Sequence, residues 1–157
     1  MTPRPYFLIA ALVAWPAHGE PLTREDRTLT HAGAQAVLQA AEQAAQMMKA
    51  PSAIAVVNQD GGLLAFDRMD EVRPGSADLA IGKARTAALL QRPTEEVEEN
   101  VAKGRVGLAT AGFTALRGGT PLVIDGAVVG AIGVAGRDKE MDATIAKITA
   151  EHFATLP

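Results

Sequence analysis

The sequence predicts an α+β domain in which helices flank a five-stranded antiparallel sheet. Two Asp-Gly pairs, at residues 60–61 and 125–126, each stand between apolar segments, as in tight β-hairpins. Segments with apolar residues at helical spacing precede, separate and follow these hairpins. Strands grouped in this way indicate an antiparallel sheet rather than the alternating strands and helices of a parallel one.

The first 19 residues are typical of a secretory signal peptide. A basic start with Arg4 leads into an apolar run, residues 7–15, that is too short to span a bilayer as a helix. A plausible cleavage site, Ala17-His18-Gly19, follows. We therefore expect residues 1–19 to be removed, residues 20–157 to form a single domain, and the protein to be periplasmic or secreted. A retained N-terminal anchor is the alternative.

The first half of the remaining chain predicts one helix followed by a hairpin. Thr28 or Thr30 can cap a helix that runs to about Lys49, because a hydroxyl there satisfies free backbone N–H groups, and Pro51 ends it. One face of this helix carries Val37, Ala41, Ala44 and Met48. The hairpin strands cover residues 52–58 and 63–69.

The second half predicts two helices, three short strands and a last helix. These elements cover residues 76–91, 94–105, 113–116, 122–125 and 127–134, and a segment that starts near Asp138. In the last helix one stripe carries Met141, Ile145, Ile148 and His152. Because glycines stand at positions 104, 107 and 112, the sequence does not clearly predict a helix or a strand between them.

Composition narrows the possible functions. A net charge of −3 provides no basic surface for nucleic acid, and no membrane span is expected once the signal is cleaved. The chain has no cysteine, which excludes disulfides, thiolate metal sites and cysteine nucleophiles. Few aromatic residues and many alanines indicate a core of small side chains, which favours a homo-oligomer that buries further surface.

The glycine-rich stretch GGTPLVIDGAVVGAIGVAG, residues 118–136, could bind a phosphate or form a hairpin. Gly130, Gly133 and Gly136 have the wrong spacing for a dinucleotide fingerprint, and no Lys-Ser/Thr pair follows a glycine as in a Walker loop. We therefore interpret the stretch as a hairpin in which Gly130 and Gly133 allow a neighbouring helix or a flat ligand to approach closely.

Three motifs together resemble the GlcG/HbpS family, which is also related to the C-terminal domain of PduO-type proteins. They are VVNQDGGLLAFDRMD, IGKARTAALLQRPT and the glycine-rich stretch followed by Asp142. The resemblance implies a five-stranded, profilin/PAS-like sandwich, higher oligomers, and haem binding linked to haem or iron sensing or to haem degradation. The chain departs from the family pattern at Asn58, at Arg117 and at Ala135, where a carboxylate, a glycine and a hydroxyl are replaced.

Haem iron accepts His, Met, Tyr or Cys as ligands, and His31 is the best candidate in the mature chain. Its position in the first turn of the predicted helix favours the neutral imidazole that binds metals. A solvated histidine is the alternative. His152 and the methionines at helical spacing suit packing better. The resemblance to the family adds Thr110 as a candidate for the iron.

Candidate ligand-binding residues lie on the hairpins and on the second helix. Lys83 shares a helical stripe with apolar residues, so it either pairs with Asp70, Asp78 or Asp142 or contacts an anionic ligand. Arg68 offers two parallel donors to a carboxylate. The glycine-rich hairpin adds a group of small residues that could line a pocket: Gly118, Gly119, Pro121, Gly130 and Gly133.

The leading hypothesis is a periplasmic or secreted haem-binding protein rather than an enzyme, because no Ser-His-Asp arrangement or other catalytic set is apparent. One alternative is a module that binds a small organic acid through Lys83 and Arg68. Another is an oligomeric accessory protein without catalysis.

Overall fold

The computed structural model describes residue 22 and residues 25–155. The predicted signal peptide, residues 1–19, lies outside the described residues. Within the described part, no helix is long and apolar enough to cross a membrane.

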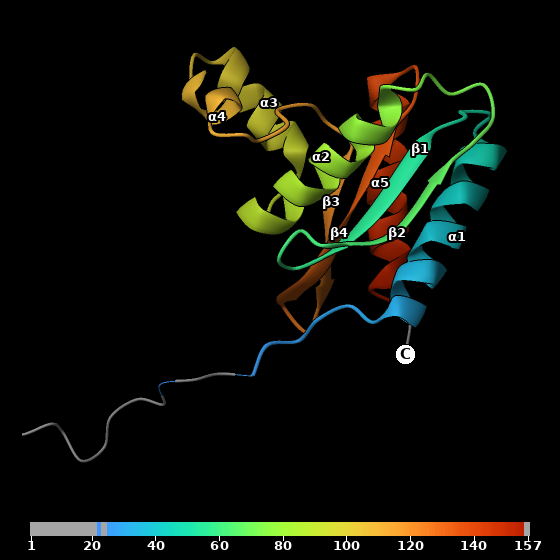
Figure 1. The fold of residues 1–157 in the computed structure, drawn as a ribbon, viewed down its shortest axis with the longest axis horizontal. Coiled ribbons are helices and arrows are strands. Elements are labelled where there is room, and N and C mark those ends of the chain that lie inside the picture. Colours follow the sequence, from blue (N-terminus) through green and yellow to red (C-terminus); the bar gives the residue numbers. More distant parts are fainter. Residues whose placement is uncertain (1–21, 23–24, 156–157) are drawn as a thin grey trace, which may run out of the picture.

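Four strands form one antiparallel sheet in the order β2-β1-β4-β3, so β2 and β3 are the edge strands (Figure 1). The elements follow in the order α1 (His31–Met47), β1 (Ala53–Asn58), β2 (Leu63–Arg68), α2 (Ser76–Leu90), α3 (Thr94–Ala102), α4 (Gly107–Thr110), β3 (Gly119–Ile124), β4 (Ala127–Ala135) and α5 (Lys139–Phe153). Both predicted hairpins are present, and the α+β class with an antiparallel sheet flanked by helices is confirmed.

The predicted strand at residues 113–116 is wrong, and the described sheet therefore has four strands rather than five. The backbone N–H of Thr114 donates to Oγ1 of Thr86 in α2, at 2.8 Å, so this segment is attached to a helix instead of a neighbouring strand. Gly112 and Gly118 bracket it with φ angles of 83° and 109°, which belong to turns rather than to extended backbone.

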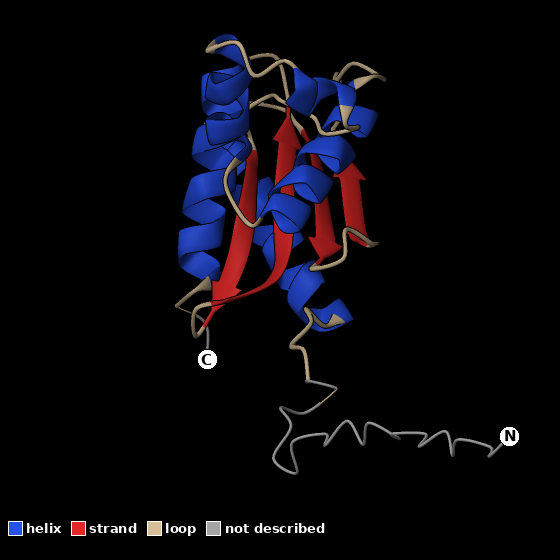
Figure 2. Ribbon diagram, turned by 90° about the vertical axis from the view of Figure 1, so that its left-hand side faces the viewer, coloured by secondary structure: helices blue, strands red, loops and turns tan. Residues whose placement is uncertain are grey.

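Helices cover the two faces of the sheet differently (Figure 2). On one face α1 and α5 enclose a core of branched side chains, including Val37, Ile54, Ile132 and Ile145. On the other face α2 packs on a layer made almost wholly of alanine, including Ala55, Ala84 and Ala131. Because alanine side chains are short, α2 lies close to the strands beneath it.

This close approach explains Gly119 of β3 and Gly133 of β4. A Cβ on Gly133 would lie 2.1 Å from the carbonyl oxygen of Ala80, and one on Gly119 would lie 2.4 Å from that of Lys83. Gly130 has a different neighbour, because a Cβ there would lie 2.4 Å from the carbonyl oxygen of Val57 on the adjacent strand β1. The space above Gly133 is thus filled by a neighbouring helix, which was one of the two predicted alternatives.

Substituting Gly133 should therefore destabilise the protein strongly. We expect Gly133→Ala to lower the free energy of unfolding by about 1–3 kcal/mol or more, because the new methyl group meets α2 backbone that has no room to move away. The measurement is the urea denaturation midpoint. Gly107→Ala is the matched control, since nothing lies within 4 Å of a Cβ at that helical position. Equal midpoints for the two variants would contradict the packing argument.

Candidate functional site

A buried ion pair joins α2 to α5 at the end of the sheet where β4 finishes. Nζ of Lys83 donates to Oδ2 of Asp142 at 2.9 Å and to the carbonyl oxygen of Val134 at 2.7 Å. The two side chains are only 5% and 6% exposed. Of the three acids predicted as partners for Lys83, Asp142 is the one that pairs with it in the structure. A ligand carboxylate at Lys83 would have to compete with these two acceptors.

Burial raises the pKa of Asp142, although the Lys83 ammonium and the backbone N–H of Gly136 both act to lower it. That N–H donates to the other carboxylate oxygen, Oδ1, at 2.7 Å. Asp142 therefore holds the loop between β4 and α5 as well as Lys83. The ion pair therefore holds α2, α5 and the end of β4 together.

Gly118 and Gly119 lie directly against this pair. A Cβ on Gly118 would lie 2.7 Å from the carbonyl oxygen of Val134 and 3.0 Å from Nζ of Lys83. The backbone N–H of Gly119 donates to Oγ1 of Thr94, the first residue of α3, at 2.9 Å. Both glycines are buried, so they serve the packing of the protein's own chain around Lys83.

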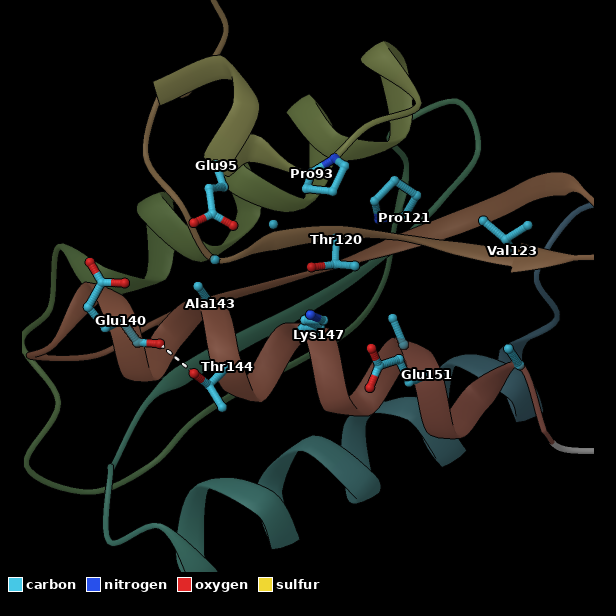
Figure 3. Close-up of a pocket in the computed structure, with 14 residues that line it drawn as sticks. Pro93, Glu95, Thr120, Pro121, Val123, Glu140, Ala143, Thr144, Lys147 and Glu151 are labelled. Carbon is cyan, nitrogen blue, oxygen red and sulfur yellow. Dashed lines mark hydrogen bonds between the residues drawn. The ribbon is translucent and has the colours of Figure 1, made fainter. Parts of the chain in front are cut away.

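A cavity of about 550 Å³ opens beside these glycines, between β3, α5 and the start of α3 (Figure 3). Its apolar surface comes from Pro93, Pro121, Val123 and alanines of α5, and charged side chains stand around it. The charged residues are Glu95, Glu140, Lys147 and Glu151. The cavity is lined by three of the predicted ligand-binding residues, Gly118, Gly119 and Pro121. None of its lining residues is a histidine or a methionine.

Arg117 forms an ionic cluster next to this cavity that the sequence analysis missed. Its guanidinium pairs with Glu98, with Glu140 at 2.8 Å and with Glu95 at 3.3 Å. Burial acts to raise the pKa of Glu98, but Arg117 and Lys139 outweigh it and the pKa is lowered. Three acids around one arginine tie α3 and α5 together. The run TEEVEE, residues 94–99, indicates excess negative charge on α3. The arginine that balances this charge, Arg117, lies outside the helix and later in the chain.

His31 lies at the opposite end of the sheet. It is exposed and begins α1, next to the N-cap Thr30, whose Oγ1 accepts from the N–H of Gly33 at 3.1 Å. Leu29, just before it, is joined to β4 by its N–H, which donates to the carbonyl oxygen of Val129 at 2.9 Å.

A second cavity, of about 400 Å³, is lined by Thr30 and Gly33, which are close to His31 in the sequence, although His31 itself is not among its lining residues. It lies between the start of α1, the β3–β4 hairpin and the end of α5, and apolar side chains form most of its wall. Its lining residues are Arg27, Thr28, Leu29, Thr30, Gly33, Ile124, Val129 and Phe153. At its edge Nη1 of Arg27 lies 2.5 Å from Oδ2 of Asp125.

The remaining predicted residues lie elsewhere. Arg68 is exposed on the edge strand β2. Thr110 is exposed at the end of α4, and its hydroxyl donates to the carbonyl oxygen of Gly107 at 2.9 Å. His31 and Lys83 are at opposite ends of β4, so the predicted residues do not form one centre. Among the residues that the structure covers, no group of three His, Cys, Asp or Glu side chains could hold a metal ion.

Comparison with known proteins gives one family over most of the chain. The family model described as "Haem degrading protein HbpS-like" matches residues 29–151. Protein GlcG of Escherichia coli K12 is 44% identical over 102 residues, which are 64% of this chain and 76% of GlcG.

Two solved structures share the fold. Klebsiella pneumoniae protein ORFY superimposes with a TM-score of 0.82 and 28% identity, over 88% of this chain and 99% of that one. A PduOC–haem complex has a TM-score of 0.72 and 26% identity, over 83% of this chain and 97% of that one.

Breaking the buried pair should be far more costly than removing it. We expect Lys83→Met to lower the free energy of unfolding by about 3–5 kcal/mol, because the buried carboxyl group of Asp142 would lose its cationic partner. The double variant Lys83→Met/Asp142→Leu should recover most of that loss. Both are measured by urea denaturation.

Lys103→Met is the control, because Lys103 pairs with Glu99 at 3.3 Å on the exposed surface, where such pairs contribute little. If the two substitutions acted independently, the double variant would be less stable than Lys83→Met by the loss that Asp142→Leu causes alone. That result would refute the proposed coupling.

Proposed function

The chain belongs to the HbpS-like family of haem-degrading proteins, as its motifs predicted, and on this basis we propose that it binds haem with His31 as the iron ligand. The observation that carries the proposal is the position of His31, which is exposed at the start of α1, where its sequence neighbours Thr30 and Gly33 line an apolar cavity. The haem complex of the related PduOC fold supports a haem-related role.

The residues around His31 suit a haem group. Imidazole is a common axial ligand, and the nearby walls of Leu29, Ile124, Val129 and Phe153 can cover an apolar macrocycle and exclude water from it. Arg27, at the edge of the same cavity, can pair with a propionate if it exchanges its contact with Asp125. Haem, when bound, would supply an iron centre for ligand binding or electron transfer.

The other cavities suit haem less well. The larger one, beside β3 and α5, is surrounded by three acidic side chains and one lysine, which would repel the anionic propionates of haem. His152 lines a hollow of about 200 Å³ between α1 and α5, which is half the size of the cavity at His31. Thr110 offers only a neutral hydroxyl, which is a weak ligand. These comparisons favour His31.

The proposal includes a periplasmic or secreted location, from the signal-like residues 1–19, and a homo-oligomer. The cavity beside His31 is open to solvent, so a second copy of the chain could cover the part of the haem that this cavity leaves exposed.

Haem titration tests the proposal. We expect hemin added to the purified protein to give a saturable, shifted Soret band, and His31→Ala to lose the band or weaken binding by about tenfold or more, since the axial nitrogen is removed. His152→Ala is the matched control and should bind as the wild type does. A titration that is identical to free hemin would refute haem binding, and equal loss in both variants would refute His31 as the ligand.

Haem degradation, which the family description names, is the alternative to binding alone. We propose that binding is the function and expect the haem complex to be stable. The test is to incubate the haem complex with ascorbate and oxygen and to follow the Soret band. A steady band supports binding, and its decay with release of iron would favour degradation.

A further inference from the structure

A third cavity, of about 400 Å³, lies at the end of the sheet away from His31 and carries a concentration of positive charge. Three loops form it: the one after α1, the one between β2 and α2, and the one between β4 and α5. Each loop contributes one cationic side chain, respectively Lys49, Arg73 and Arg137. The net charge of the whole chain is −3, so three cationic side chains at one cavity differ from the charge of the protein as a whole.

The acidic residues at this cavity do not cancel the charge. Asp142 is neutralised by Lys83, at 2.9 Å. Oδ1 of Asp138 accepts from the backbone N–H groups of Glu140 and Met141, at 2.8 and 3.3 Å, so this carboxylate is turned toward the start of α5. Glu71 is the other acid among the lining residues. The local balance remains positive.

The inner surface of the cavity is apolar with a polar base. Met48, Ala50, Pro51, Val72 and Met141 provide the apolar part. At the base, Ser52 is fully buried and its hydroxyl donates to the carbonyl oxygen of Ala50 at 2.9 Å. Such a surface fits a ligand with an anionic end and an apolar body. The volume lies within the range of small-molecule sites, roughly 300–1,000 Å³.

Two lining residues adopt a strained backbone conformation. Lys49 has φ of 50° and Glu71 has φ of 64°, and both are left-handed conformations that glycine adopts at lower cost. Lys49 follows the last turn of α1, where Ala50 N–H donates to the carbonyl oxygen of Ala45 at 2.9 Å, a position at which glycine is strongly preferred. From this strained position Lys49 contributes to the lining of the cavity.

We propose that this cavity is a binding site for a small organic carboxylate with a compact apolar body, held by Arg73 and Arg137. A guanidinium offers two parallel N–H donors that match a carboxylate, and the two arginines come from different loops. Arg73 makes one long contact, from Nη2 to the carbonyl oxygen of Gly136 at 3.4 Å, which it can exchange for a stronger one. The site is separate from His31 and does not depend on haem.

Calorimetry with phenylacetate and its neutral amide tests the site. We expect phenylacetate to bind the purified protein at one site per chain, and phenylacetamide not to bind. Arg73→Gln and Arg137→Gln should each weaken binding by about tenfold or more, because each removes a charge-assisted contact. Arg105→Gln is the matched control, since Arg105 is exposed near α4, away from the cavity, and its loss should change nothing.

Methionine methyl NMR of the wild-type protein locates the ligand even if a variant fails to fold. Phenylacetate should shift the methyl resonances of Met48 and Met141, which line the cavity, and leave that of Met47, which is 78% exposed outside it. The proposal is overturned if phenylacetate does not saturate below about 10 mM, if the amide binds equally, or if the shifts occur at Met47 alone.

Discussion

The close contact between α2 and the strands beneath it determines the rest of the architecture. Glycine and alanine on β4 allow the helix backbone to rest almost on the strand, because any Cβ on Gly133 would collide with it. At that distance Lys83 can reach past the edge of its helix to β4 and to Asp142 of α5. A layer of small side chains thus leads to a buried charge pair, which could not form beneath a helix held farther away by larger residues.

The two ends of the sheet differ in chemistry as a result. At one end the ion pair, the loop at Gly136 and the strained Lys49 lie around a positively charged cavity. At the other end the start of α1 presents an imidazole beside an apolar cavity. Because β4 runs the whole distance between them, the protein can carry two unrelated ligand sites without either occupying the space of the other.

The sequence predicted local structure well and the meeting of distant residues poorly. Helices α1, α2 and α5 and both hairpins followed from periodicity and Asp-Gly turns. Residues 113–116 resemble a strand in composition, but a hydroxyl on α2 takes the N–H of Thr114, and no pattern along the chain shows this. Lys83 was correctly found to be unusual, yet only the fold could choose Asp142, 59 residues away, from three acids. The cationic cavity comes from three loops that have no periodic signal.

The edge strands have a consequence for solubility. A sheet with two open edges can add strands from other molecules and grow into fibrils. On β3, Pro121 has no N–H to offer an incoming strand. On β2, Asp67 and Arg68 place charged side chains on opposite faces of the sheet near the end of the other open edge. These residues oppose the addition of strands at both edges, so that any self-assembly of this chain would have to form through the helical and loop surfaces.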